Sequence, residues 1–173
     1  MTSARVFVYG TLKKGQPNHF YLDETSGRAK RGTSKFMGKA QTLDKYPLVV
    51  ATRLNVPFLL AARGVGKSQT LIGEVYEVDE ECFQTLDELE GYPKVYGREL
   101  INVRLLEHDG NGASCGDTIQ CWCYFLYNFR PDLLNLPYHE EYDDSKRPED
   151  ARFDGKSEPD ESLWKEVRTD CVD

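Results

Sequence analysis

The sequence predicts an α+β domain built on a small, curled, mostly antiparallel β-barrel with a few short helices. Three observations support this fold class. Short apolar segments rich in β-branched and aromatic residues recur between turn residues, as they do in antiparallel sheets. Pro47 and Pro57 stand near the starts of two such segments, where the missing N–H is tolerated. One longer helical pattern interrupts the series, and 173 residues suffice for one domain with a sizeable core.

Seven strands are predicted, at residues 5–9, 35–43, 46–52, 56–62, 69–78, 95–107 and 117–127. The last two flank a stretch with Asp-Gly and Asn-Gly pairs, so they are expected to pair as a hairpin. Gly73, inside the fifth segment, indicates a bend or a close approach of two backbones. A short helix is expected at residues 16–22, with Pro17 in its first turn.

The longer helix is predicted from its two ends. Asp79 is a suitable N-cap, and Glu80 and Glu81 follow in the first turn, where the helix dipole favours negative charge. Gly91 is expected at the position after the helix, with Pro93 just beyond it to prevent continuation. The helix should therefore end at residue 90.

Glu90 is the candidate general base. It continues the apolar stripe of Phe83 and Leu86 at helical spacing, so its carboxylate is expected on the buried face. The negative end of the helix dipole contributes roughly 0.3–2 kcal/mol against ionisation, and burial adds to it, so both raise the pKa towards neutrality. The alternative is that Glu90 leans outward and pairs with Lys94 or Arg98.

A second candidate element follows the first strand. Gly10 comes directly after Tyr9 and is followed by Thr11 and Leu12. A glycine at this place lets the backbone turn sharply and leaves successive N–H groups outside the sheet, where they can hold an anion or a carbonyl oxygen. A plain exit from a strand into a loop remains the alternative.

Charge and composition exclude several classes of partner. Residues 1–70 carry 12 basic and 3 acidic side chains, whereas residues 71–173 carry 10 and 26. The basic residues are scattered singly rather than clustered with aromatics, so we expect the two halves to pack together and no nucleic acid to bind. No apolar run approaches the roughly 18 residues of a membrane span, and no apolar leader follows Met1. These features predict a cytosolic protein, expected to be a monomer.

Neither a metal nor a phosphate-binding loop is predicted. The five cysteines contain no Cys-x-x-Cys pair, so they are expected to be reduced, with Cys121 and Cys123 either packing in a strand or forming half of a metal site. The three histidines have no spaced metal partner. Residues 64–68 end like a P-loop, but the first required glycine would fall at Ala61 and a strand follows. We interpret them as a hairpin turn.

The C-terminal part differs in character from the rest. From Glu140 onward, 13 of 34 residues are acidic and 6 are basic. We therefore predict a domain at residues 1–143 and an acidic tail at residues 144–173, with a short helix near residues 161–167. Truncation after Arg147 is expected to change stability and turnover little, since few apolar groups are available to anchor the tail.

Several motifs in the same order resemble the gamma-glutamylamine cyclotransferases, within the wider gamma-glutamyl cyclotransferase-like, or AIG2-like, fold. They are Val6-Phe7-Val8-Tyr9-Gly10-Thr11-Leu12, Gln16-Pro17-Asn18, Tyr46-Pro47-Leu48-Val49, Gly73-Glu74-Val75-Tyr76, Leu86-Asp87-Glu88-Leu89-Glu90 and Leu136-Pro137-Tyr138-His139. The resemblance covers residues 5–143. It departs at Gly91-Tyr92-Pro93, where many relatives have other residues.

The resemblance implies a cofactor-free enzyme that acts on a small gamma-glutamyl amine, such as gamma-glutamyl-ε-lysine, and forms 5-oxoproline. It assigns Glu90 as the catalytic acid and base, and Tyr9, Gly10, Thr11 and Leu12 as the binding loop for the glutamyl group. Tyr96 could add a hydroxyl or be a core residue. The alternatives are a cyclotransferase for gamma-glutamyl amino acids or glutathione, and a catalytically silent binding protein of the same fold.

Overall fold

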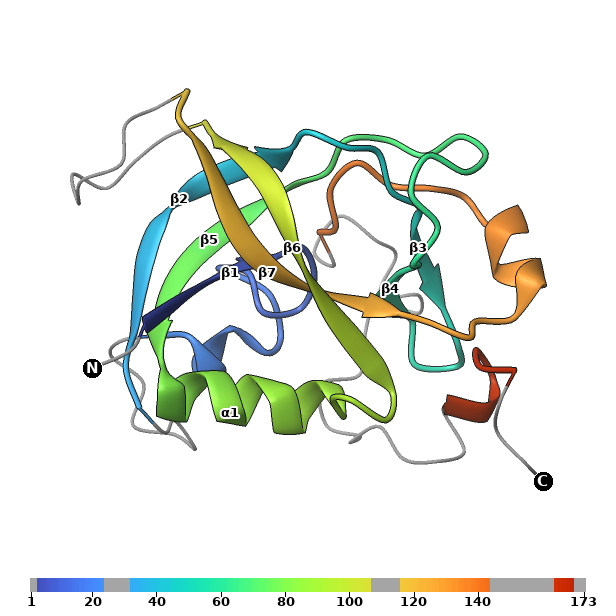
Figure 1. Ribbon diagram of the computed structural model, residues 1–173. Coiled ribbons are helices and arrows are strands. Elements are labelled where there is room, and N and C mark those ends of the chain that lie inside the picture. Colours follow the sequence, from blue (N-terminus) through green and yellow to red (C-terminus); the bar gives the residue numbers. More distant parts are fainter. Residues whose placement is uncertain (1–2, 24–31, 107–115, 144–163, 170–173) are drawn as a thin grey trace.

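The computed structural model describes residues 3–23, 32–106, 116–143 and 164–169. Five strands form a closed barrel in the order β1-β5-β2-β6-β7, and β3 and β4 form a separate two-stranded sheet (Figure 1). The elements are β1 (Ser3–Val8), β2 (Ser34–Thr42), β3 (Leu48–Ala51), β4 (Val56–Leu59), β5 (Ile72–Asp79), α1 (Glu80–Glu90), β6 (Tyr96–Leu105) and β7 (Thr118–Leu126), with 3-10 helices at His19–Tyr21 and Pro131–Asn135. The predicted fold class is confirmed.

The barrel is antiparallel except where it closes. β6 and β7 pair in the expected hairpin register from Tyr96 opposite Leu126 to Arg104 opposite Thr118, while most of the predicted turn lies outside the described residues. The closing contact is parallel, between β1 and β7 at Val6 and Trp122. Sequence periodicity does not reveal such a contact, since it joins the first strand to the last.

Alternate residues of β1 belong to two different apolar clusters. Val6 and Val8 pack in a cluster that includes Leu86 of α1, which lies along one side of the barrel. Phe7 and Tyr9 belong to a second cluster. Because side chains alternate along a strand, β1 packs on both of its faces. The position at which the following loop begins is therefore fixed.

Two local predictions need correction. The helix expected at residues 16–22 is only a single 3-10 turn, because the backbone N–H of Asn18 bonds the Thr11 carbonyl at 2.8 Å and folds the chain back onto the first loop. Residues 64–68 do form exposed turns, but the strands on either side, β4 and β5, lie in different sheets, so they make no hairpin.

The C-terminal segment 164–169 is docked on the domain, so the premise that few apolar groups anchor the tail is wrong for these residues, and truncation after Arg147 would remove the contacts they make. Val167 is fully buried in the cluster of Val6 and Leu86. Its carbonyl accepts a hydrogen bond from the Arg130 N–H at 2.7 Å, and Thr169 donates to the Asn128 carbonyl at 2.7 Å. The low average hydrophobicity of residues 144–173 gave no indication of this short apolar contact. Figure 1 shows this segment in red, below β3 and β4.

The described part of the chain contains no helix with the length and apolar character needed to cross a membrane.

Candidate active site

A cavity of about 60 Å³ opens between the end of β1, the end of α1 and the β3–β4 sheet. One water molecule needs roughly 10–15 Å³ on this measure, so the cavity has room for a small polar group. Its walls are formed by Phe7, Val8, Tyr9, Gly10, Thr11, Leu12, Asn18, Val56, Pro57, Leu89, Glu90, Tyr96, Tyr124 and Trp164. All five candidate site residues from the sequence therefore line one cavity.

The ends of α1 fix the position of Glu90. The Asp79 side chain caps the helix by accepting a hydrogen bond from the Cys82 N–H at 2.8 Å, as predicted. Gly91 adopts a left-handed conformation with φ 67°, and the Tyr92 N–H then bonds the Asp87 carbonyl at 2.9 Å. The helix consequently stops directly after Glu90, at the cavity.

The carboxyl group of Glu90 has a raised pKa. Glu90 is half-buried as a residue, and burial raises the pKa of its carboxyl group from 4.5 to about 7. The alternative of an ion pair with Arg98 is wrong, because Arg98 Nε lies 3.2 Å from Asp87 Oδ1 and its guanidinium stacks on Tyr92. Near neutral pH this group can both accept and return a proton.

Burial of Glu90 predicts a pH-dependent cost to folding. Its pKa of about 7 in the folded protein exceeds the ordinary 4.5, so the wild-type protein should lose stability as the pH rises between these values. The difference in unfolding free energy between Glu90→Gln and wild type should therefore shift by roughly 1–3 kcal/mol in favour of the variant between pH 4 and pH 8. Urea unfolding of both proteins at the two pH values measures this. A difference independent of pH would contradict the buried state of the carboxyl group.

Three tyrosines surround Glu90. Burial, followed by smaller contributions that include the charge of Glu90, raises the pKa values of Tyr9, Tyr96 and Tyr124. Tyr9 donates its hydroxyl proton to the Tyr124 carbonyl at 3.0 Å, and Tyr124 donates to Asp87 Oδ1 at 2.6 Å. All three phenols therefore stay protonated, and they can only act as neutral hydrogen-bonding groups near the carboxylate.

The loop after β1 is held from one side and leaves donors on the other. Asn18 Nδ2 donates to Thr11 Oγ1 at 3.0 Å, and His19 Nδ1 lies 3.0 Å from the Leu12 carbonyl oxygen. Among the described residues, no acceptor bonds the backbone N–H of Thr11 or Leu12. Both residues line the cavity, and their N–H groups are the loop's available donors for a carboxylate or a carbonyl oxygen bound there.

Two glycines are required by close approaches rather than by backbone conformation. A Cβ on Gly10 would lie 2.9 Å from Cγ of Pro57, so this residue is needed for space, and Gly10 does not have a positive φ. A Cβ on Gly73 would lie 2.3 Å from the Val8 carbonyl oxygen, which confirms the close approach predicted for that glycine. Both contacts keep the end of β1 against its neighbours.

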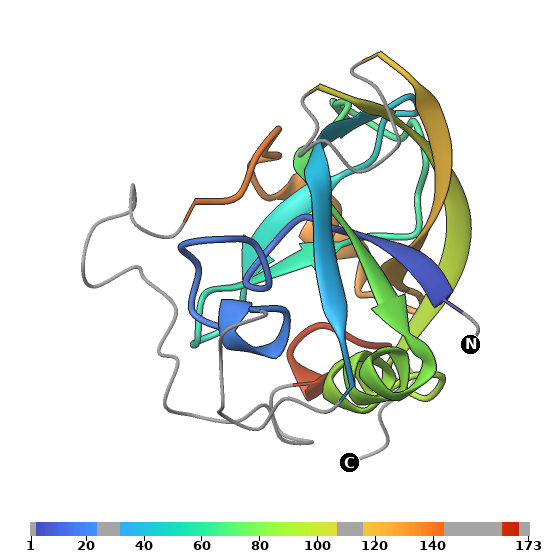
Figure 2. The same ribbon diagram turned by 90° about the vertical axis from the view of Figure 1, so that its left-hand side faces the viewer.

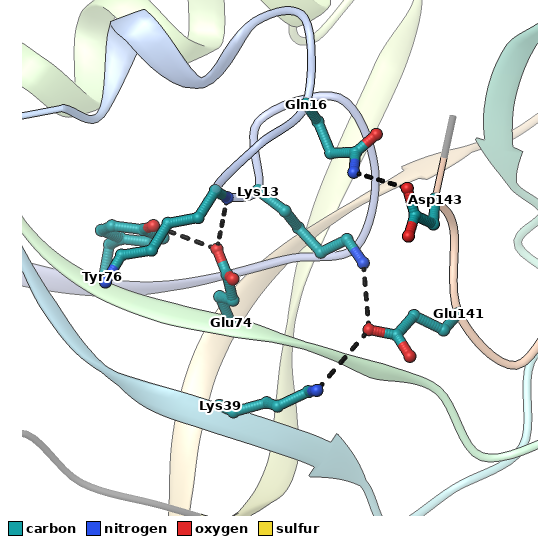
Figure 3. Close-up of polar contacts among 8 residues, drawn as sticks. Lys13, Gln16, Lys39, Glu74, Tyr76, Glu141 and Asp143 are labelled. Atoms are coloured by element: carbon teal, nitrogen blue, oxygen red, sulfur yellow. Dashed lines mark hydrogen bonds and ion pairs between the residues drawn. The ribbon is translucent and has the colours of Figure 1, made fainter. Parts of the chain in front are cut away.

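A polar network fixes the continuation of the loop (Figure 3). The dashed contacts join Lys13 to Glu141 at 3.4 Å and Gln16 to Asp143 at 3.2 Å, while Glu74 accepts from the Lys14 N–H at 2.8 Å. The pKa of Lys13 is lowered by burial, against which the nearby Glu141 acts. Here basic residues of the first half meet acidic residues of the second, as the charge asymmetry predicted.

Other sequence candidates lie elsewhere. Cys121 and Cys123 are buried packing residues in the second apolar cluster. Within the described ranges, no group of three or more His, Cys, Asp or Glu residues is placed to hold a metal ion. His19 contacts the back of the loop rather than the cavity.

Sequence reasoning missed several residues of the cavity wall. Tyr124 had no signal beyond its place in a strand, because its position over Asp87 depends on how the barrel closes. Val56 and Pro57 come from the small β3–β4 sheet, whose placement no local pattern gives. Trp164 lies at the start of the docked C-terminal segment, within the stretch whose composition predicts an acidic tail.

A protein-family model described as gamma-glutamyl cyclotransferase, AIG2-like, matches residues 6–144, which include every candidate site residue. The chain belongs to this family. Within this AIG2-like family, a rat gamma-glutamylaminecyclotransferase is 44% identical over 151 residues, covering 87% of this chain and 95% of the relative. The human gamma-glutamylaminecyclotransferase is 40% identical with the same shares covered. The resemblance inferred from the motifs is confirmed.

A solved structure supports the fold independently. The crystal structure of an AIG2-like protein from Mus musculus superimposes with a TM-score of 0.75 at 39% identity, covering 89% of this chain and 97% of the mouse chain. The family model ends at residue 144, so the docked segment 164–169 lies beyond it.

Proposed function

We propose that this AIG2-like chain is a gamma-glutamylamine cyclotransferase, which converts gamma-glutamyl amines such as gamma-glutamyl-ε-lysine into 5-oxoproline and the free amine. One observation carries the proposal: a carboxyl group with a pKa of about 7 lies in the same cavity as the loop of Gly10, Thr11 and Leu12. Relatives more than 40% identical that bear this name support the substrate class.

The reaction needs no nucleophile from the protein. The α-amine of the substrate attacks its own γ-carbonyl carbon, a five-membered lactam forms, and the bond to the leaving nitrogen breaks. Holding the glutamyl chain in a folded conformation can lower such a barrier by several kcal/mol, and up to about 7–11 in the best intramolecular cases. What remains for the protein is to orient the chain, transfer protons from the attacking to the leaving nitrogen, and stabilise developing charge.

Glu90 would carry the proton. The substrate amine has an ordinary pKa near 8, so it is mostly protonated at neutral pH and must lose a proton before it attacks. A carboxylate with a pKa of about 7 is well matched to accept that proton and to return it to the departing nitrogen. After the new C–N bond forms, the attacking nitrogen loses a second proton, which Glu90 can pass to the leaving nitrogen in the same way. The substrate ammonium thereby becomes a lactam N–H, the amine leaves as an ammonium ion, and Glu90 ends the cycle as a carboxylate.

The loop would bind the glutamyl half. The N–H groups of Thr11 and Leu12 can hold the α-carboxylate or the oxyanion that develops on the γ-carbonyl oxygen. Tyr96 lines the cavity, and its pKa is raised partly by the charge of Glu90. We assign it a hydrogen bond to the substrate or to the Glu90 carboxylate.

The leaving amine distinguishes this activity from its closest alternative. An ε-linked lysine keeps its own carboxylate far from the scissile bond, whereas an α-linked residue places one next to it, near Glu90. Arg98 is engaged with Asp87 and does not offset that repulsion. We expect kcat/KM for gamma-glutamyl-ε-lysine to exceed that for gamma-glutamyl-alanine by at least ~10-fold, or about 1.4 kcal/mol.

The test follows 5-oxoproline release from gamma-glutamyl-ε-lysine, gamma-glutamyl-alanine and glutathione side by side. Equal or reversed rates would assign the chain to cyclotransferases that act on α-linked gamma-glutamyl compounds. Release from none of the three would favour a silent binding protein of the same fold.

We further propose that the protein works as a monomer in the cytosol. The free, buried thiols of Cys121 and Cys123 are supporting features, since reduced cysteines are usual in that compartment. Light scattering of the purified protein, with and without substrate, tests the oligomeric state.

A further inference from the structure

One wall of the cavity comes from outside the family match. Trp164 lines the cavity together with Glu90, although the family model ends at residue 144. Its indole ring meets Phe58 edge to face, with centroids 6.4 Å apart, and Tyr96 likewise at 6.0 Å. Trp164, Tyr96 and Glu90 all line this cavity, and the charge of Glu90 contributes to the raised pKa of Tyr96.

The chain around Trp164 is anchored firmly enough to hold the ring in place. Val167, three residues on, is fully buried, and its carbonyl accepts the Arg130 N–H. Glu166 forms an ion pair with Arg53 of the turn between β3 and β4. The segment 164–169, drawn in red in Figure 2, thus contacts both the turn between β3 and β4 and the loop after β7.

Exposure of the lining residues shows which end of the cavity faces solvent. Tyr9, Gly10, Leu12, Tyr96 and Tyr124 are buried and form its inner part. The lining residues that are half-buried are Thr11, Asn18, Val56, Leu89, Glu90 and Trp164, and we assign them to the rim because part of each residue reaches solvent. Three of these six, Val56, Leu89 and Trp164, are apolar.

We propose that Trp164 is a specificity-determining residue that packs against the aliphatic stem of the leaving amine. This inference rests on the proposed cyclotransferase function. With the glutamyl group in the inner part and its γ-carbonyl near Glu90, the leaving group extends over the rim. An unbranched alkyl stem matches the apolar rim, and a large, rigid indole face gives contact area at little entropic cost.

The test compares two substrates with the same glutamyl half and the same type of scissile amide: gamma-glutamyl-ε-lysine, whose leaving amine has a four-carbon stem and a charged amino-acid end, and gamma-glutamylmethylamide, whose leaving amine has a single methyl group. Both release a primary alkylamine, so the chemical step is alike. Trp164→Ala should lower kcat/KM for the lysine compound by about 10-fold, equivalent to ~1.4 kcal/mol, and for the methylamide by less than about 2-fold. Trp164→Phe, which keeps an apolar ring, should stay within about 3-fold of wild type on both.

Lys165→Ala is the matched control, since Lys165 lies in the same segment but does not line the cavity. It should leave the ratio of the two kcat/KM values unchanged. A Trp164→Ala protein that loses activity equally on both substrates, or on neither, would overturn the inference.

A binding measurement covers the case in which Trp164→Ala fails to fold. In a Trp122→Phe, Glu90→Gln protein, Trp164 is the one remaining tryptophan of the sequence. Its fluorescence should change saturably with gamma-glutamyl-ε-lysine and little with the methylamide; no change with either would overturn the inference. If the wild-type protein turns over neither substrate, the proposed function fails, and this inference with it.

Discussion

Replacing Glu90 by Gln is expected to lower kcat for 5-oxoproline formation by roughly 100-fold or more while the fold persists. The amide keeps the size and most hydrogen-bonding capacity of the carboxyl group, but it cannot accept the proton of the substrate amine. Because the carboxyl group is buried and has a pKa of about 7, its removal should not weaken packing. Steady-state kinetics with gamma-glutamyl-ε-lysine, together with circular dichroism, measures both parts of the prediction.

Glu88→Gln is the matched control for this change. Glu88 lies on the same helix, two residues earlier, and is exposed to solvent. The turnover of the Glu88→Gln protein should remain close to that of wild type. If Glu90→Gln also turned over at nearly the wild-type rate, Glu90 would not be the base.

Replacing Gly10 by Val should abolish most of the activity through a steric effect on the loop. The new Cβ would lie 2.9 Å from Pro57 Cγ, so the loop or the β3–β4 sheet must shift. A displacement of about 1 Å at a reacting centre can cost 10²-fold in rate, and we expect a loss of that size in kcat/KM. The far-ultraviolet spectrum should be unchanged, because β1 ends at Val8 and Gly10 belongs to no barrel strand.

A second-site change tests the stated cause. Pro57→Ala removes the atom that the new side chain meets, so the Gly10→Val, Pro57→Ala protein should recover part of the lost activity relative to Gly10→Val alone. Full activity of the single Gly10→Val variant would mean that the loop is only a connector.

Local sequence rules were sufficient for the elements that bear the candidate site. The N-cap at Asp79 and the left-handed Gly91 fix both ends of α1, and these are short-range effects that single residues encode. The burial of Glu90 followed from its helical spacing to Leu86. The place of Gly10 directly after a strand followed from the apolar run before it.

The remaining parts of the site depend on contacts between distant segments. Tyr124 reaches Asp87 across 37 residues, and the parallel contact of β1 with β7 that brings it there has no local signal. Arg98 could pair with either Glu90 or Asp87 on sequence spacing, and only the folded geometry selects Asp87. Trp164 was hidden because the average composition of an acidic segment says nothing about one buried valine nearby.

The central claim is that the substrate supplies its own nucleophile in a cavity that holds Glu90 and the loop of Gly10, Thr11 and Leu12. The most direct test is the mass of the acid released from gamma-glutamyl-ε-lysine when the reaction runs in water enriched in oxygen-18. Closure of the lactam uses no water, so the account predicts unlabelled 5-oxoproline in equal amount to free lysine. Labelled glutamate would instead show that water attacks the γ-carbonyl, and it would contradict the account.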